Sequence, residues 1–359
     1  MKTFALGQIL AVIRLELGKT FFARRGLWIY LLALAPVVLF LGHSIYAPRE
    51  QQRLARLAAA HPVPAKALNS IQTGMSRQEV LKDLGRPYFQ RTWRHRRGPR
   101  RFREHVFYAY TDGRSDFHFF FADGRLRFIR RDDPDTLAKL SVIFATVFQY
   151  YYLRLAVFFG CVGVFINLFR GEMLDKSLHF YLLTPVRREV LTVGKYLAGL
   201  LATMVIFTAS TALQIAAMLW EFGHGAVGSY LAGGGWGQIG AYLGITALAC
   251  VGYGSVFLAA GLLFRNPIIP AAAVLIWESA NLFLPPTLKH LSLIFYLQSL
   301  CPVVAAPAGN LPRLLTLLIS AAQPASHAAA LACVLVFSLA VVAVSCLRAR
   351  TLEISYGTD

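Results

Sequence analysis

The stretch Gln238-IGAYLGITALACVGYGSVFLAAGLL-Phe264 contains no Asp, Glu, Lys or Arg, and it decides the fold class of this chain of 359 residues. A helix needs about 20 predominantly apolar residues to cross the hydrocarbon core of a membrane, and this run is longer than that. Comparable apolar runs recur at 27–46, about 149–169, 196–220, 268–284 and 327–347. We therefore predict a polytopic α-helical membrane protein with six transmembrane helices, the first over 27–46 and the other five within 138–359.

The composition agrees with a membrane protein, because 56% of the residues are hydrophobic and only 15% are charged. Soluble domains usually contain about a quarter charged residues. The formal net charge of +18 raises the question of nucleic acid binding. However, the basic residues lie in loops and in one polar segment, and no DNA-binding motif accompanies them. The expected surroundings are membrane lipid, and we predict no nucleic acid partner.

Basic residues in short loops predict the topology, since Lys and Arg favour the cytoplasmic side. Arg14, Lys19, Arg24 and Arg25 precede the first span and place the N-terminus in the cytoplasm. Six spans then put the loop 170–195 and the C-terminus on the same side. The polar segment 47–137 falls outside, although it is basic. Long folded segments translocate largely regardless of their charge, so this topology stands.

Residues 1–26 are expected to form a cytoplasmic interfacial amphipathic helix or, alternatively, a plain helical lead-in to the first span. Apolar residues recur at the spacing of one helical face, whereas Glu16 and Lys19 fall off that face. The apolar positions are Leu6, Ile9, Leu10, Ile13, Leu17 and Phe21.

The segment 47–137 carries the signals of a small α+β extracytoplasmic insertion. Ser76 and Glu79 have the spacing of a capping box, which predicts a helix start, and Gly85 with Pro87 predicts its end. Aromatic and β-branched runs at 105–110, 117–121 and 126–129 come next, separated by Asp-Gly turn signals at 112–113 and 123–124. These runs predict an antiparallel meander after the helix.

This insertion resembles the BamE/SmpA-like fold of small envelope proteins. The matching motifs are Gly74-Met75-Ser76, Val80 to Pro87, and Phe121-Ala122-Asp123-Gly124. Members of that family lie in the periplasm, so the resemblance implies a periplasmic insertion in a bacterial inner membrane protein. The insertion is expected to meet either cargo or a periplasmic envelope partner. The basic stretch 94–101 does not belong to the pattern. It is either a contact for anionic lipid or an acidic partner, or a solvated loop.

The loop Arg170-GEMLDKSLHFYLLTPVRREVLTVG-Lys195 between the second and third spans carries the functional prediction. Pro185 lacks an N–H and disfavours helix at Thr184, so it separates a short apolar helix over 178–183 from the residues after it. On physical grounds alone, this helix either anchors the loop at the membrane surface or seats in a groove of a soluble partner.

The loop resembles the signature loop of ABC type-2 exporter permeases. The residues at the family spacing are Glu172, Ser177, Leu178, Leu182, Thr184, Pro185, Arg188, Gly194 and Lys195. The chain departs from the pattern at Lys176, where Gly is usual, and at Ser177, where Thr is usual. The resemblance implies that this loop is a coupling helix received by a cytoplasmic ABC ATP-binding subunit. It also implies a second permease copy, with the homodimer and the heterodimer both open.

No catalytic motif accompanies the loop: the sequence contains no complete phosphate-binding loop, no HExxH and no nucleophile elbow. We predict that the chain is not an enzyme and binds no cofactor, ATP and Mg being bound by the partner subunit. The implied function is a permease that moves a hydrophobic, amphiphilic or lipid-linked substrate. The alternative is a non-transporting envelope signalling or scaffold protein built on the same fold. The sequence does not identify the substrate.

Two ionisable residues fall inside the expected spans. Glu278 lies in the middle of the fifth span, where a charge is costly and therefore faces protein or a cavity. It either lines the translocation path or pairs across a dimer, or it is a hydrogen-bonded structural residue. Arg154 is placed nearer the outer end of the second span, where its long side chain is expected to snorkel to the interface.

Overall fold

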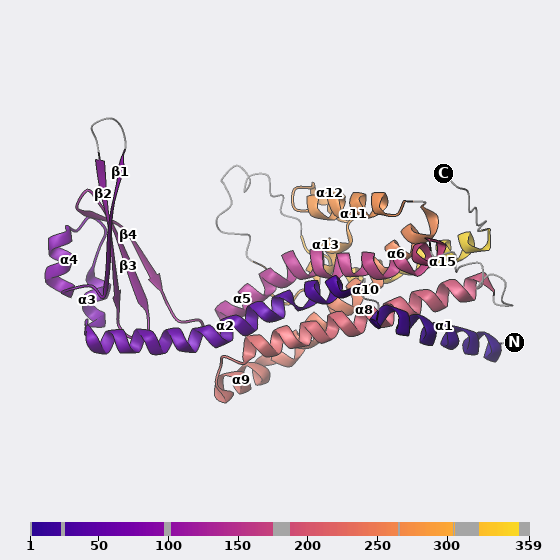
Figure 1. Cartoon of the computed structure of the whole chain (residues 1–359), viewed down its shortest axis with the longest axis horizontal. Coiled ribbons are helices and arrows are strands. Elements are labelled where there is room, and N and C mark those ends of the chain that lie inside the picture. Colours follow the sequence, from indigo (N-terminus) through magenta and orange to yellow (C-terminus); the bar gives the residue numbers. More distant parts are fainter. Residues whose placement is uncertain are drawn as a thin grey trace. The chain divides into compact units, whose positions relative to one another are not determined.

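The computed structural model describes residues 2–22, 26–96, 102–174, 187–264, 266–303, 305 and 323–351. The chain divides into two compact units, which are described separately. The helical bundle comprises residues 1–41 and 140–359, and the inserted unit comprises residues 42–139 (Figure 1).

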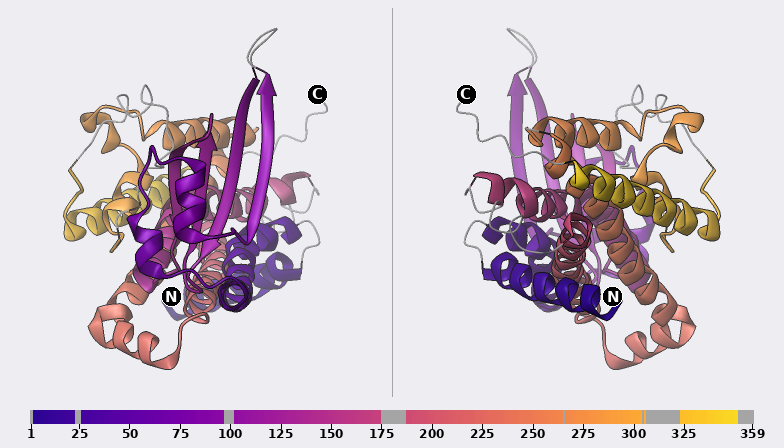
Figure 2. Two further views of the ribbon diagram at one scale, coloured as in Figure 1. Left: turned by 90° about the vertical axis from the view of Figure 1, so that its left-hand side faces the viewer. Right: turned by 90° about the vertical axis from the view of Figure 1, so that its right-hand side faces the viewer.

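The described part of the bundle is helical throughout its length (Figures 1 and 2). Two helices, α2 and α5, continue from the bundle into the inserted unit. The elements are α1 (Lys2–Phe22), α2 (Leu27–Ala60), α5 (Leu137–Val147), the π-helix η2 (Phe148–Val157), α6 (Phe158–Leu174), α8 (Arg188–Leu219), α9 (His224–Tyr230), the π-helix η3 (Leu231–Gly235), α10 (Trp236–Leu263), α11 (Ile268–Ala280), α12 (Pro286–Lys289), α13 (Leu293–Ser299) and α15 (His327–Arg350).

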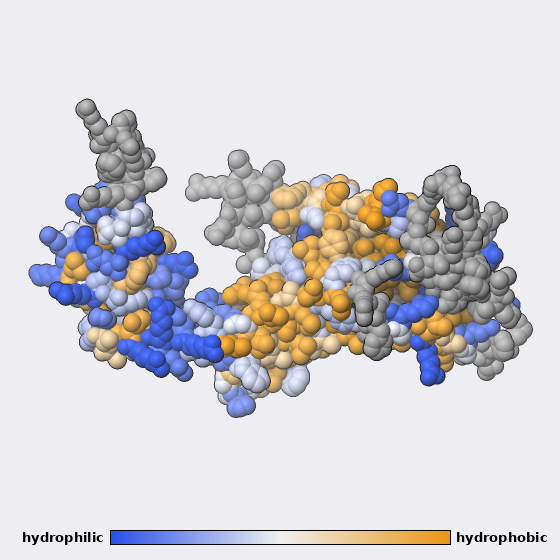
Figure 3. All heavy atoms as spheres, viewed as in Figure 1, coloured by the Kyte–Doolittle hydropathy of each residue, from blue (hydrophilic) through white to orange (hydrophobic). Residues whose placement is uncertain are grey.

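Within the described residues, five helical stretches are long and apolar enough to cross a membrane. Hydrophobic residues also cover much of the face of the bundle that is seen in Figure 3. The stretches are Leu27–Ala60, Leu137–Phe169, Arg188–Leu219, His224–Leu263 and His327–Arg350. The chain is therefore a helical, multi-pass membrane protein by the length and composition of its helices.

The structure corrects the fifth expected span, 268–284. This segment forms α11, a helix of only 13 residues, and α12 and α13 come after it as shorter pieces. At about 1.5 Å per residue α11 is about 20 Å long, which is less than the hydrocarbon thickness of about 30 Å. The periodicity and apolar character of the segment are visible in the sequence, but the break after Ala280 is not.

Helices α10 and α15 nevertheless run in the same direction. Ala241 and Leu248, in the first half of α10, share a groove with His327 and Leu331, at the start of α15. Further along α10, a Cβ atom on Gly252 would lie 3.4 Å from Val334. Because the two helices are parallel, the chain between them has to return from one end of the bundle to the other. The short helices α11, α12 and α13 belong to this return.

Glycines allow the central helices to approach closely. A Cβ atom on Gly199 of α8 would lie 2.9 Å from the ring of Phe165, and one on Gly254 of α10 would lie 2.5 Å from the same ring. Phe165, on α6, is fully buried. Its ring is therefore held between two glycine surfaces, in the small-residue packing that is typical of membrane helices.

Pro36 leaves a gap in the hydrogen bonding of α2 that neighbouring helices fill. A proline has no N–H, so the carbonyl four residues earlier, that of Leu32, loses its helical donor. The hydroxyl of Tyr151 donates to this carbonyl at 3.3 Å, and Ser210 donates to the next one, Ala33, at 2.5 Å. These contacts satisfy backbone groups that no water reaches in a bilayer.

The inserted unit is a four-stranded antiparallel sheet with two short helices. Its elements are α3 (Ala65–Ser70), α4 (Arg77–Leu84), β1 (Phe89–Arg96), β2 (Phe102–Thr111), β3 (Asp116–Ala122) and β4 (Arg125–Asp132). The strands pair in sequence order, so the predicted meander is confirmed, with β1 as a strand that the sequence did not reveal. Val80 and Leu84 of α4 pack on the sheet face that carries Tyr108 and Phe119. The basic stretch was expected over 94–101, and residues 97–101 lie outside the described part.

The helix α4 has the predicted capping box. Ser76 accepts a hydrogen bond from the backbone of Glu79 at 3.3 Å, and the Glu79 carboxylate accepts one from the backbone of Ser76 at 2.7 Å. This hydrogen bond holds the pKa of Glu79 below its usual value. Because the pKa of Glu79 is lowered in the folded chain, its carboxylate stabilises the fold at pH values above the ordinary carboxyl pKa. This stabilisation is lost as the pH falls through the lowered pKa. At the other end, Gly85 has φ +74°.

Replacing Ser76 with alanine is expected to loosen α4 selectively. Loss of an N-cap side chain costs about 0.5–2 kcal/mol, because a backbone N–H at the helix start loses its acceptor. Faster amide hydrogen exchange over 77–84 in the full-length chain would show this effect. Ser70→Ala is the matched control, because the Ser70 hydroxyl only donates to the Ala67 carbonyl at the end of α3. Equal exchange in the two variants would contradict the prediction.

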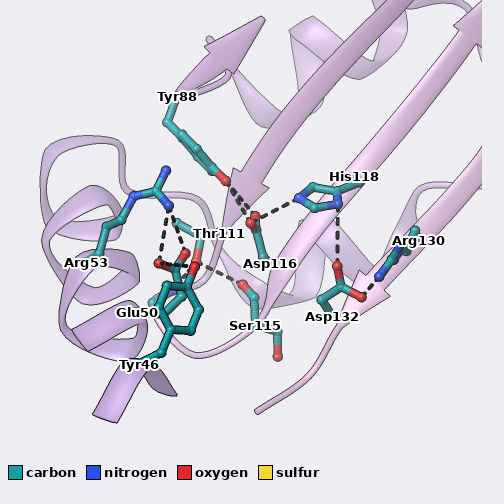
Figure 4. A network of polar contacts seen from close by, with 11 residues as sticks. Tyr46, Glu50, Arg53, Tyr88, Thr111, Ser115, Asp116, His118, Arg130 and Asp132 are labelled. Carbon is teal, nitrogen blue, oxygen red and sulfur yellow. Dashed lines mark hydrogen bonds and ion pairs between the residues drawn. The ribbon is translucent and has the colours of Figure 1, made fainter. Parts of the chain in front are cut away.

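A network of polar contacts crosses the inserted unit (Figure 4). The Tyr88 hydroxyl donates to both oxygens of Asp116 at 2.8 Å, and His118 lies 3.0 Å from the same carboxylate. The other ring nitrogen of His118 lies 3.5 Å from Asp132. Burial and the Asp116 carboxylate both raise the pKa of Tyr88, which therefore stays a neutral donor. The network joins the residue before β1 to β3 and β4.

Candidate functional site: the junction around Lys195

Lys195 joins three helices at the end of the bundle where α6 ends and α8 begins. Its ammonium lies 2.7 Å from the Glu16 carboxylate of α1 and donates to the Leu168 carbonyl of α6 at 2.8 Å. Lys195 is 0% exposed and Glu16 is 3% exposed. The ammonium also lies 5.5 Å from the centre of the Phe169 ring. A buried pair of this kind holds its partners in place, because separating it would leave a charge without compensation.

Gly194 allows α1 to approach α8 at the same point. A Cβ atom on Gly194 would lie 3.0 Å from Val12 and 3.7 Å from the Ile9 carbonyl. The face of α1 that packs on α8 therefore includes Val12 and Glu16. Glu16 falls off the apolar face by its spacing, yet its carboxylate is buried against α8. Glu16 is the sole acidic residue before the first span, and this isolation is the signal that could have indicated a specific partner.

The first turn of α8 is joined to the end of α15. Arg188 donates to the Arg350 carbonyl at 3.1 Å, and the Arg350 guanidinium forms an ion pair with Glu189. The end of α15 and the helix α1 thus lie at the same end of the bundle. We name the contacts of Glu16, Lys195, Arg188 and Arg350 the α8 junction. Four elements, α1, α6, α8 and α15, meet in it.

The structure places four of the nine predicted coupling residues. Glu172 belongs to the last turn of α6, and Arg188 opens α8. Gly194 and Lys195 lie further along α8 and face α1, so Lys195 holds the bundle together and is not presented to a partner. The others, Ser177, Leu178, Leu182, Thr184 and Pro185, lie outside the described residues.

Glu278 joins two of the short helices. Its carboxylate accepts hydrogen bonds from the Ser292 hydroxyl at 2.7 Å and from the backbone of Leu293 and Ile294 at 3.0 Å and 2.9 Å. Glu278 is 5% exposed. This arrangement links α11 to the start of α13. Glu278 therefore has a structural role in the segment between α10 and α15.

Arg154 is placed differently from the prediction. The helix of the second span begins at Leu137, well before the expected start near 149, so Arg154 lies near the middle of Leu137–Phe169. Its guanidinium lies 3.4 Å from the Glu278 carbonyl and 5.5 Å from the centre of the Tyr150 ring. The expectation that Arg154 snorkels to the membrane surface is wrong, because its side chain packs inside the bundle.

Comparison with protein-family models, curated proteins and solved structures found no match to this chain. The class of multi-pass helical membrane protein therefore rests on the five apolar helices and their packing. The functional assignment has to be argued from the α8 junction and from the sequence of the loop beside it.

Proposed function

We propose that this chain is the permease subunit of an ATP-driven exporter in a bacterial inner membrane. It would cross the membrane six times: five times through the long helices, and once through the segment that contains α11, α12 and α13. Both ends of the chain and the loop 170–195 would face the cytoplasm, and the inserted unit would face the periplasm. The permease would act as a dimer with two copies of a separate ATP-binding subunit, which holds ATP and Mg.

The observation that carries this proposal is the α8 junction. Residues 175–186, which hold most of the signature-loop motif, connect two elements that both take part in this junction, α6 and α8. A force applied to that segment would reach α1 through Lys195 and α15 through Arg188. Rigid-body motion of packed helices is a common way to convert nucleotide binding into a conformational change. The cargo would be a hydrophobic, amphiphilic or lipid-linked molecule.

The proposal predicts that the loop holds the ATPase. The full-length chain, carrying an affinity tag, would be expressed with the ATPase of the neighbouring gene and purified in mild detergent. Joint replacement of Glu172, Pro185 and Arg188 with alanine is expected to lower the recovered ATPase at least about tenfold, because losing about 1.4 kcal/mol of contact energy has that effect. The double variant His224→Ala, Ser229→Ala, in the exposed helix α9, is the control.

Two outcomes would count against the proposal. Equal recovery of ATPase with the triple variant and the control would remove the loop from the interface. Failure of any ATPase to purify with the unmodified chain would favour the signalling or scaffold alternative instead.

A further inference from the structure

The first strand of the inserted unit lies at an open edge of its sheet. The strands pair in the order β1-β2-β3-β4, so β1 and β4 are the two edges. An edge strand presents a row of backbone N–H and C=O groups that point away from the sheet and can pair with another chain. In the described part of the chain, residues 89–93 of β1 make no backbone hydrogen bonds beyond those to β2. This edge is therefore available to a further strand.

The opposite edge of the sheet, at β4, is protected. The Gly74 N–H donates to the Leu126 carbonyl at 2.8 Å, and the Leu126 N–H donates to the Met75 carbonyl at 2.9 Å. The register between β3 and β4 also shifts at Phe120/Phe121. Covering segments and bulges of this kind keep an edge from pairing with other chains. By contrast, β1 pairs with β2 in one unbroken register and contains no proline.

Aromatic side chains stand beside this open edge, on the sheet face opposite α4. Phe89 is 50% exposed and Trp93 is 41% exposed. The ring of Phe89 packs on Phe107 of β2 with the ring centres 6.0 Å apart, and Trp93 stacks on His105 of β2 at 5.8 Å. The rings of β1 are therefore held in place by the next strand. They offer an apolar surface next to the free backbone groups.

The charge of β1 determines which kind of strand can pair with it. Its sequence, FQRTWRHR, contains three arginines and no acidic residue. Arg91 is exposed and lies between Phe89 and Trp93 on the same face, because alternate residues of a strand share a face. Opposite charges on neighbouring strands stabilise their pairing, whereas like charges directly opposite each other destabilise it. A second copy of β1 would add only positive charge, so the complementary strand is an acidic one.

We infer that β1 binds an extended acidic segment of a partner protein, which adds to the sheet as an outer strand. In this mode of recognition, backbone hydrogen bonds supply affinity and alternate side chains supply specificity. Apolar residues of the partner would pack on Phe89 and Trp93, and an acidic residue between them would pair with Arg91. Only the view that the partner is an envelope protein rests on the proposed function, through the periplasmic placement of the inserted unit.

The test uses the purified full-length chain in dodecyl maltoside, without any ATPase. The probe is a fluorescein-labelled peptide of sequence EVEFTETY. Paired antiparallel with β1, it places phenylalanine opposite Trp93, glutamate opposite Arg91 and tyrosine opposite Phe89. Fluorescence anisotropy measures binding, and amide hydrogen exchange over 89–93 reports where the peptide lies. Saturable binding with slower exchange over 89–93 is expected, because amides in a formed ladder are protected.

Two kinds of control peptide separate the parts of the inference. The peptide KVKFTKTY has the same apolar pattern with the opposite charge, and it is expected not to bind. N-methylation of alternate residues removes the backbone donors from one edge of EVEFTETY. A peptide strand pairs with β1 through one edge alone, so one of the two methylation patterns is expected to abolish binding and the other to retain it.

Arg91→Glu is expected to weaken the Kd for EVEFTETY about tenfold and to create binding of KVKFTKTY, because an attractive cross-strand pair becomes a repulsive one. Trp93→Thr keeps a residue that favours strands and removes the ring, and it is expected to weaken binding about threefold. Arg127→Glu makes the same charge change at an exposed position of β4 and is expected to leave both peptides unaffected.

The other outcomes overturn the inference. Equal binding of the two peptides, or equal effects of Arg91→Glu and Arg127→Glu, would disprove the selection by charge. Peptide binding without protection of 89–93, or equal binding of both methylated peptides, would disprove the added strand. Protection of 89–93 by phosphatidylglycerol bicelles and not by the peptide would assign the edge to lipid. Protection that instead grows with protein concentration would assign it to a second copy. Binding is measured without the ATPase, so failure of the ATPase to copurify leaves this result unaffected.

Discussion

Replacing Lys195 with methionine is expected to destabilise the bundle by about 3–5 kcal/mol, because the buried carboxylate of Glu16 would lose the buried one of its two cationic neighbours. Methionine retains most of the volume of the side chain, so the packing against Phe169 is largely kept. The loss would be measured as a lower unfolding temperature of the full-length chain in detergent. It would also appear as faster proteolysis of α1, which Lys195 holds against α8.

The matched control is Lys19→Met. Lys19 lies 3.9 Å from the same Glu16 carboxylate, but its side chain is 50% exposed. An exposed pair contributes only about 0–1 kcal/mol, so this variant is expected to change stability little. The double variant Lys195→Met, Glu16→Gln removes both charges and is expected to recover much of the lost stability. A Lys195→Met chain as stable as the Lys19→Met chain would contradict the assignment of a buried pair.

Replacing Gly254 with valine is the second change that is expected to destabilise the bundle strongly. A Cβ atom at this position would lie 2.5 Å from the ring of Phe165, which is closer than real side chains approach. The ring has little room to move, because it also packs on Gly199 of α8, where an added Cβ atom would lie 2.9 Å from it. Overpacking a core costs about 1–3 kcal/mol and sometimes more. A lower yield of folded, monodisperse protein and a lower unfolding temperature would show it.

Gly244 is the control on the same helix, because a Cβ atom there meets nothing within 4 Å. Gly244→Ala is expected to be neutral or mildly stabilising, since alanine is favoured over glycine in helices by about 1 kcal/mol. Shrinking the ring in the double variant Gly254→Val, Phe165→Leu is expected to restore part of the stability. If Gly254→Val and Gly244→Ala had the same unfolding temperature, the close packing of Phe165 against Gly254 would be disproved.

The features that the sequence predicted well depend on short-range signals. The capping box at Ser76 and the turn at Asp123-Gly124, with φ +54° and +81°, are set by residues only a few positions apart. The five long helices are set by apolar length alone. Strand β1 was missed because its sequence, FQRTWRHR, alternates basic with aromatic or polar residues and resembles a solvated segment.

The features that the sequence did not predict depend on contacts between distant residues. Lys195 and Glu16 are separated by 179 positions, and no local pattern reports that they meet. The position of Arg154 was misjudged because the start of its helix was set too late. After the break that follows α11, the carboxylate of Glu278 accepts hydrogen bonds from the start of α13, a contact between residues 15 and 16 positions apart. Of the nine motif residues of the signature loop, the described part of the chain includes Glu172, Arg188, Gly194 and Lys195.

The contact between Arg154 and the Glu278 carbonyl also sets an order of events during synthesis. The two residues are 124 positions apart. At a translation rate of about 5–20 residues per second, Arg154 enters the membrane roughly 6–25 s before Glu278 leaves the ribosome. For that interval the nascent chain holds a buried guanidinium without its eventual neighbours. The contact between the second span and α11 can therefore form only after most of the bundle has been synthesised.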